Sequence, residues 1–182
     1  MRNRWPACNI VVTSSLLQKE DQPLLFEMGV LTTIYKPTTQ TRFVGELLSS
    51  LSKQTARPEE RLTRSIRKDL QQGNLKQAEE QRKTIEKNEL LSESRLQTLN
   101  AEFEYARGNY EKTITILKDN PNNQHDQLIT LDLLGKSMLK LGFLQEALLC
   151  FDKARDQSPK NLTRLCLISE VEHSLGLEDK MR

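Results

Sequence analysis

The sequence has little of several features that define common protein classes. Aromatic residues make up 5% and hydrophobic residues 36% of its 182 residues, which is little for one large compact core. No hydrophobic run could cross a bilayer, and Ile10–Val12 behind the basic start is too short for the core of a secretory signal. Neither charge sign dominates, because 27 Lys and Arg stand against 25 Asp and Glu. Nucleic acids and membranes are therefore not expected as main partners.

Cysteine and histidine are scarce as well. The three cysteines, Cys8, Cys150 and Cys166, show no metal-type spacing, and their odd number without a signal peptide indicates reduced thiols and a cytoplasmic protein. The two histidines, His125 and His173, lack the set of further ligands around them that a metal site would need. Phosphate-binding glycine loops, nucleophile elbows and paired catalytic carboxylates are also missing. We expect no enzyme activity, no metal and no cofactor.

A repeat is the main feature that the sequence does contain. Gly73, Gly108, Gly142 and Gly176 are 35, 34 and 34 residues apart, and each opens a similar short segment. Self-similarity at this period predicts stacked pairs of helices, an architecture that commonly binds other protein chains. The expected repeat units are 59–93, 94–127, 128–161 and an incomplete 162–182.

The third unit shows the repeat pattern most clearly. Gly142 stands where its first helix must stop, and Pro159 follows its second helix. Apolar and small residues follow helical spacing between these points: Leu131, Leu134, Gly135, Met138, Leu141, Ala147, Phe151 and Ala154. This pattern resembles the tetratricopeptide repeat, which implies two antiparallel helices per unit. The first two units depart from it, with Arg82 where an aromatic residue is expected and Asn100 where a leucine is usual.

The resemblance to tetratricopeptide repeats also implies a concave wall formed by the first helix of each pair. Carried over by register, the wall would consist of Thr63, Arg67, Leu70, Arg95, Thr98, Glu102, Tyr105, Ile129, Asp132, Lys136, Leu139, Cys166, Glu170 and His173. The residues at about the ninth position of each first helix alternate in the sign of their charge: Arg67, Glu102, Lys136 and Glu170. Such a wall suits a polar or amphipathic segment with interspersed charges, and Tyr105 is the best single anchor for it.

The first 55 residues do not share the period. Asn9–Thr13 and Leu31–Tyr35 are short β-branched runs that predict strands, with a helix over Gln18–Met28 between them. A further helix, capped by Thr38, is expected to carry its apolar residues on one face: Phe43, Val44, Leu47, Leu48 and Leu51. Strand, helix, strand and helix predict a parallel crossover unit followed by one helix.

Two motifs stand at the ends of these expected strands: Val11-Val-Thr-Ser-Ser15, and Ile34-Tyr-Lys-Pro37 with its Lys-Pro directly after a short strand. On these motifs, residues 8–53 resemble the C-terminal half of a bacterial response-regulator receiver domain. The resemblance implies that Lys36 is the lysine that contacts the phosphoryl group, and that Ser14 or Thr13 is the switch hydroxyl. The acidic pair and the phospho-accepting aspartate of that family have no counterpart here, so phosphoryl transfer is not expected.

The fold expected from these patterns is mainly α: a solenoid of tetratricopeptide-like hairpins over 56–182, preceded by a small βαβα segment over 1–55. The expected function is a protein–protein interaction adaptor in bacterial two-component signalling, with a protein partner in the concave wall. Two alternatives remain. One is a fragment of a phosphorylation-switched response regulator in which the repeats form the output domain. The other is a structural homo-oligomer. Self-association would use the receiver-like half or the apolar C-terminal face.

Overall fold

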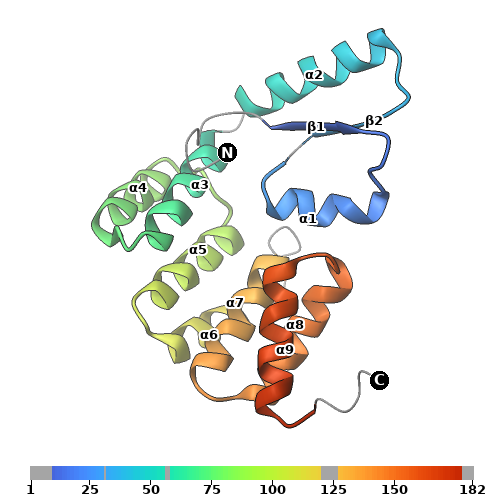
Figure 1. Cartoon of the computed structure of the whole chain (residues 1–182). Helices are drawn as coiled ribbons and strands as arrows, with labels where there is room; N and C mark the ends of the chain where they lie inside the picture. The colour runs from blue at the N-terminus through green and yellow to red at the C-terminus, as the bar shows by residue number, and fades with distance from the viewer. Residues whose placement is uncertain (1–9, 31, 56–57, 120–126, 178–182) are drawn as a thin grey trace. The chain divides into compact units, whose positions relative to one another are not determined.

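The computed structural model describes residues 10–30, 32–55, 58–119 and 127–177, without the side chains of 53–55 and 58, and these residues are mainly helical (Figure 1). They contain nine α-helices and two short strands. The chain divides into two compact units, Met1–Ser65 and Ile66–Arg182, which meet within helix α3 (Pro58–Gln71). The sequence placed this division at residue 55. Among the described residues, no helix is both long and apolar enough to pass through a bilayer.

The first unit contains the expected parallel pair of strands. Strands β1 and β2 run parallel, with Val11 opposite Thr32 and Ser14 opposite Tyr35. Its elements are β1 (Val11–Ser14), the 3₁₀ turn η1 (Lys19–Asp21), α1 (Gln22–Glu27), β2 (Thr32–Tyr35) and α2 (Gln40–Thr55). Asn9 and Leu31, which we expected in the strands, lie outside the described residues. The predicted order of strand, helix, strand and helix is confirmed.

Helix α2 begins one residue later than the sequence predicts. The Thr39 hydroxyl oxygen accepts a hydrogen bond from the backbone N–H of Arg42 at 3.3 Å, which is the contact that an N-cap makes with the third helical residue. The cap is therefore Thr39 and not Thr38. Further along α2, Ser50 accepts a hydrogen bond at 2.9 Å from Thr32, which connects the helix to β2.

The second unit is a succession of helices joined in pairs by short turns (Figure 1). After the end of α3 come α4 (Leu75–Lys87), α5 (Glu93–Ala106), α6 (Tyr110–Lys118), α7 (Gln127–Lys140), α8 (Leu144–Gln157) and α9 (Leu162–Ser174). Helix α5 packs on α6, α6 on α7, α7 on α8 and α8 on α9, and α5 also contacts α7. The first helices of the second and third pairs are therefore in contact as well.

Each of the four periodic glycines stands two residues after the end of a helix: α3, α5, α7 or α9. Gly73, Gly108, Gly142 and Gly176 have φ values of +77°, +83°, +81° and +69°, a region that glycine enters without steric cost. At the third turn, the N–H of the following Phe143 donates to the carbonyl of Met138 at 2.9 Å, which closes the helix. The period of the sequence thus reflects one turn geometry used four times.

The core of the second unit lies between consecutive helices. One cluster of fully or nearly buried residues joins α7, α8 and α9: Met138, Ala147, Phe151, Ile168 and Val171. Next to this cluster, Gly135 of α7 lies against the ring of Phe151 of α8. A β-carbon at position 135 would lie 2.6 Å from the Cε1 atom of the phenyl ring, so this crossing of α7 and α8 requires glycine.

Candidate functional site

The predicted wall residues come from helices α3, α5, α7 and α9, but two of them are not at the surface. Thr63 is 4% and Thr98 is 0% exposed. Their hydroxyls donate to backbone carbonyls one turn earlier, Thr63 to Glu59 at 2.8 Å and Thr98 to Ser94 at 3.2 Å. Because this bond satisfies the hydroxyl inside its own helix, burial carries little polar cost. The placement of these two threonines on a binding wall was therefore wrong.

Two of the alternating charges bind each other. The Arg67 Nη2 atom lies 2.7 Å from Oε1 of Glu102, and its Nε atom donates to both carboxylate oxygens at 2.9 Å. Only 28% of the Arg67 side chain and 12% of the Glu102 side chain are exposed. The sequence presented these charges as contacts for a partner, whereas the structure uses them to join α3 to α5.

Asp132 is likewise occupied, by an arginine that the sequence did not single out. The Arg164 guanidinium on α9 donates from Nε to Oδ1 of Asp132 at 2.8 Å and from Nη2 to Oδ2 at 3.0 Å. Its Nη1 donates to the carbonyls of Ala154 and Ser158, which end helix α8. The Arg164 side chain is only 1% exposed, so this residue is an internal clamp between α7, α8 and α9.

The remaining wall residues have accessible surface, and most of them lie on helices α7 and α9. Cys166, Glu170 and His173 on α9 are exposed. The others are half-buried: Leu70 on α3, Arg95 and Tyr105 on α5, and Ile129, Lys136 and Leu139 on α7. Helices α7 and α9 therefore offer more of the predicted wall than α3 and α5.

Tyr105, the expected anchor, lies edge-on to Tyr110. The two ring centroids are 5.4 Å apart at an interplanar angle of 60°. Burial, together with neighbouring Tyr110, raises the pKa of the Tyr105 hydroxyl above its usual value. The phenol is therefore neutral at physiological pH and can donate a hydrogen bond to a ligand.

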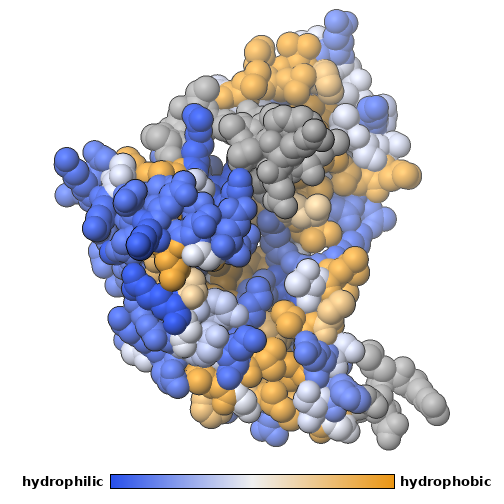
Figure 2. Space-filling model, turned by 60° about the vertical axis from the view of Figure 1, so that its left-hand side comes forward, coloured by the Kyte–Doolittle hydropathy of each residue, from blue (hydrophilic) through white to orange (hydrophobic). Residues whose placement is uncertain are grey.

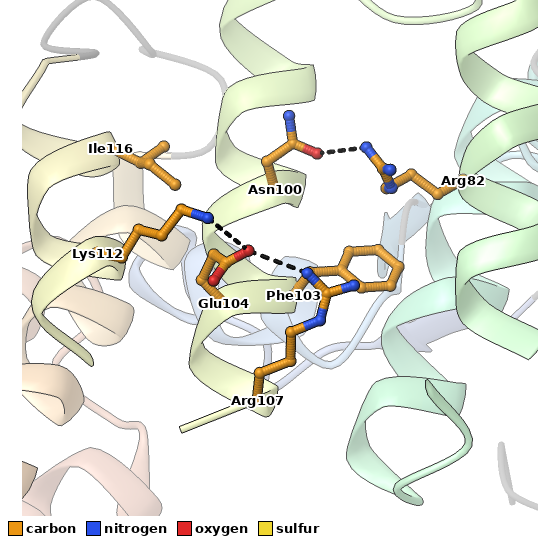
Figure 3. A pocket seen from close by; sticks show the side chains of 7 residues that line it. All are labelled: Arg82, Asn100, Phe103, Glu104, Arg107, Lys112 and Ile116. Carbon is orange, nitrogen blue, oxygen red and sulfur yellow. Dashed lines mark hydrogen bonds and ion pairs between the residues drawn. The ribbon is translucent and has the colours of Figure 1, made fainter. Parts of the chain in front are cut away.

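A cavity of about 240 Å³ lies between helices α4, α5 and α6 (Figure 3). Its lining combines three cations with one carboxylate, one amide and two apolar groups: Arg82, Arg107, Lys112, Glu104, Asn100, Phe103 and Ile116. The sequence identified Arg82 and Asn100 only as departures from the repeat pattern. It held no signal that they meet, because they lie on different helices 18 residues apart.

Two carboxylates hold the cations of this cavity in place. Oε1 of Glu104 lies 3.0 Å from Nη1 of Arg107 and 3.2 Å from Nζ of Lys112. Its other oxygen accepts from the Asn109 amide at 2.8 Å, and this bond, with the charges of Lys112 and Arg107, lowers the pKa of Glu104. Glu79 lies outside the lining and binds both arginines, Arg82 at 2.7 Å and Arg107 at 3.1 Å. The hydrogen bond from Arg82, followed by the charges of both arginines, lowers the pKa of Glu79 against the opposing effect of burial.

An apolar depression of about 300 Å³ lies at the C-terminal helices. It is lined by Gln145, Leu148, Leu149, Asp152, Leu175 and Leu177. Leu149 is 61% and Leu162 is 75% exposed, so large apolar side chains remain at the surface of α8 and α9. Figure 2 shows more hydrophobic surface toward these helices than on the strongly hydrophilic side formed by α3 and α4.

In the first unit, the structure brings two of the receiver-like residues together. The backbone N–H of Lys36 donates to the carbonyl of Ser14 at 3.0 Å, at the ends of the two strands. Thr13 lies one position earlier, opposite Ile34. The Ser14 hydroxyl oxygen accepts from the N–H of Leu16 at 3.0 Å. Ser14 therefore contacts Lys36 through the main chain, while its hydroxyl is engaged by the N–H of Leu16.

The described part of the chain contains no group of three or more His, Cys, Asp and Glu side chains placed to hold a metal ion. His125 lies outside the described residues, and His173 is exposed on α9. Comparison with known proteins adds no assignment: no family model, no curated protein and no solved structure matches this chain.

Proposed function

We propose that the second unit is a tetratricopeptide-like solenoid that binds a segment of a partner protein along helices α5, α7 and α9. The observation that carries this proposal is the contact between equivalent helices of successive pairs. Arg67 on α3 binds Glu102 on α5, α5 contacts α7, and Asp132 on α7 binds Arg164 on α9. First helices that lie beside each other in this way form a continuous wall, which is how helical repeats bind extended partners.

The accessible chemistry of this wall favours an amphipathic partner segment with charges of both signs. Lys136 on α7 and Glu170 on α9 carry opposite charges, and Ile129 adds half-buried apolar surface. An extended or helical segment could match this mixture over several repeats. The proposed protein is thus a cytoplasmic adaptor, and the receiver-like first unit connects it to bacterial two-component signalling.

Site-specific photo-crosslinking tests the wall. A photoreactive amino acid at Glu170 should crosslink a partner in the source cells, because this exposed position lies on the proposed wall. The same group at Lys153, exposed on the second helix of its pair, serves as the matched control. A discrete crosslinked protein from position 170 that is absent from position 153 supports the assignment. Equal products from both positions would refute it.

A phosphorylation-switched response regulator is the second candidate function. It is supported by the parallel pairing of β1 with β2, which puts Lys36 beside Ser14. The phospho-accepting aspartate would have to come from additional sequence. The intact mass of the endogenous protein separates the candidates: a mass equal to that of this sequence rejects the regulator. A larger mass, together with a beryllofluoride-dependent change in the Lys36 side-chain resonance, supports it.

Self-association is the third candidate, and exposed hydrophobic side chains support it. Leu48 on α2 is 61% exposed and Leu149 on α8 is also 61% exposed. Sedimentation velocity over a wide concentration range should then show a species heavier than the monomer. Leu48→Asp or Leu149→Asp should abolish it, whereas Gln77→Asp, at an exposed position on α4 outside both surfaces, should not. A constant monomer mass would reject the proposal.

A further inference from the structure

The face of α9 on which a second helix would pack is exposed. One and two periods before Ser169 stand Gly135 and Ala101, which are both buried. The second helix of the pair covers them: Ala101 clusters with Leu117 of α6, and Gly135 lies against Phe151 of α8. Ser169 is exposed, and among the described residues no helix follows α9. A position that α6 and α8 cover in the earlier pairs is therefore open on α9.

Large apolar side chains lie on the same face of α9. Leu162 and Leu165 precede Ser169 by seven and four residues, a spacing that places all three on one side of a helix. Leu162 is 75% and Leu165 is 36% exposed. Clustered apolar side chains at the surface are typical of an interaction site.

The apolar depression at the end of α9 adds to this face. Leu148 and Leu149 of α8 line it together with Leu175 and Leu177. Leu148 and Leu175 also pack against the buried cluster of α7, α8 and α9, so the depression continues that interface to the surface. One period before Leu148, Ile114 of α6 packs against the same cluster and is thus covered by the following helices. We call the exposed face of α9 together with this depression the terminal surface.

Helix α2 in the first unit has two apolar sides. On one side Leu47 is half-buried, and Ser50 is hydrogen-bonded to β2. On the other side an apolar stripe is 45%, 61% and 54% exposed: Val44, Leu48 and Leu51. A helix at the surface of a protein usually has a single apolar face. The exposed stripe of α2 therefore exceeds what packing on the sheet requires.

This exposed stripe has the spacing of a second helix of the solenoid. Its three residues stand at positions i, i+4 and i+7. The buried stripe of α8 has the same spacing through Ala147, Phe151 and Ala154, which are all 0% exposed. The lengths are also similar, since α2 has 16 residues and α8 has 14. The chain thus contains both a first helix with an open face and an exposed helix with the matching pattern.

We propose that the terminal surface of one copy binds helix α2 of a second copy. The inference rests on the self-association proposed above and specifies the two surfaces that meet. Because α2 and the terminal surface are different parts of the chain, the contact is heterologous. Each bound copy still offers its own α2 or its own terminal surface to the next copy. The assembly is therefore head-to-tail and grows beyond a dimer.

Mixing two variants of the whole chain tests this contact. In sedimentation velocity, the parent protein should form species heavier than a dimer as its concentration rises. Leu48→Asp and Leu149→Asp should each be monomeric alone, with the helical circular dichroism of the parent, because both leucines are exposed. Their equimolar mixture should form a dimer and nothing heavier, since one variant keeps its terminal surface and the other keeps its α2. Gln77→Asp, exposed on α4, is the matched control and should assemble like the parent.

The same measurements separate this contact from self-association in general. A constant monomer mass of the parent protein rejects both. Heavier species that persist in either leucine variant alone overturn the head-to-tail contact and leave self-association in place. A mixture that stays monomeric, although both variants are folded and the parent assembles, has the same consequence.

Photo-crosslinking identifies the segment that occupies the terminal surface. A photoreactive amino acid at Ser169 should crosslink to a peptide from α2 of another copy. The same group at Glu80, exposed on α4, is the control and should give no such product. Crosslinks from position 169 to α8 or α9 of another copy, to residues 178–182 of the same copy, or to a different protein in the source cells would each overturn the proposal.

Discussion

Arg164 on α9 and Asp132 on α7 form a bidentate ion pair, with hydrogen bonds of 2.8 Å and 3.0 Å between residues 32 positions apart. The remaining donors of Arg164 reach two carbonyls at the end of α8. An arginine buried to this degree is stable only when its donors are matched, and the acceptors here come from two other helices, α7 and α8. The pair therefore fixes how the third helix pair joins the following helix.

Asp132→Asn should destabilise the second unit strongly. The substitution keeps the size of the side chain but leaves the buried guanidinium of Arg164 without its counter-charge. The expected loss in the free energy of unfolding is about 3 kcal/mol at neutral pH, measured by urea denaturation. Asp152→Asn breaks a surface pair with Arg155 and should cost less than about 1 kcal/mol. Similar losses for the two variants would contradict the clamp.

The sequence predicts the glycine turns better than it predicts this clamp. A positive φ at Gly142 depends on its own chain segment, so a local pattern is enough to foresee it. The burial of Arg164 depends on the carbonyls of Ala154 and Ser158 and on a carboxylate from the previous repeat. The sequence of α9 alone would predict that Arg164 is an exposed arginine. Its role follows only from the packing of α9 against two other helices.

Charge reversal tests the pair between Arg67 and Glu102. Each single reversal, R67E or E102R, should lower the free energy of unfolding because it places like charges in contact. The double variant R67E/E102R should recover most of the loss, with a coupling energy of about 1 kcal/mol in a double-mutant cycle by urea denaturation. Additive losses would show that the two side chains act independently. A change at Arg67 also removes the ion pair that joins α3 to α5, so Glu170 is the cleaner position for probing a partner.

The wall shows a second limit of sequence-based prediction. Helical register correctly places Thr98 one helical turn from Glu102, but register does not determine whether that turn is exposed. Thr98 is fully buried because α5 contacts helices on more than one side, and its hydroxyl bonds within the helix. The exposed positions Glu170 and His173 lie on α9, which has fewer described neighbours. The number of packed neighbours therefore decides which wall residues remain accessible.

Gly135→Ala should destabilise the protein although alanine favours helices. The new methyl group would lie 2.6 Å from the Cε1 atom of Phe151, whose ring is fully buried and has little room to move. Overpacking of this kind costs about 1–3 kcal/mol, which exceeds the gain in helix propensity of about 1 kcal/mol. Gly45→Ala in α2 is the matched control, because no atom lies within 4 Å of its added methyl group.

The melting temperature measures the effect of both alanine substitutions. Gly135→Ala should lower it, and F151L in the same chain should restore part of the loss by making room. Gly45→Ala should leave it unchanged or raise it slightly. A melting temperature that stays the same in Gly135→Ala would mean that α7 and α8 can separate at this point without cost.

Acid should destabilise the second unit partly through Glu104. The Asn109 hydrogen bond, with the charges of Lys112 and Arg107, holds the pKa of this carboxyl below its ordinary value of 4.5. Because the folded pKa is lower than the unfolded one, the folded protein binds fewer protons between the two values. The contribution of Glu104 to stability is therefore complete above about pH 4.5 and is lost as the pH falls through the folded pKa.

Glu104→Gln removes this titration and should flatten the pH dependence. At pH 7 the variant should be less stable by about 2 kcal/mol, since it loses charge-assisted hydrogen bonds to Arg107 and Lys112. Below the folded pKa the difference from the parent protein should shrink, because the parent carboxyl is then neutral as well. Urea denaturation from pH 7 downward measures both curves. Glu111→Gln, at an exposed position on α6, controls for the loss of one negative charge, and a parallel pair of curves for Glu104→Gln and the parent would contradict the assignment.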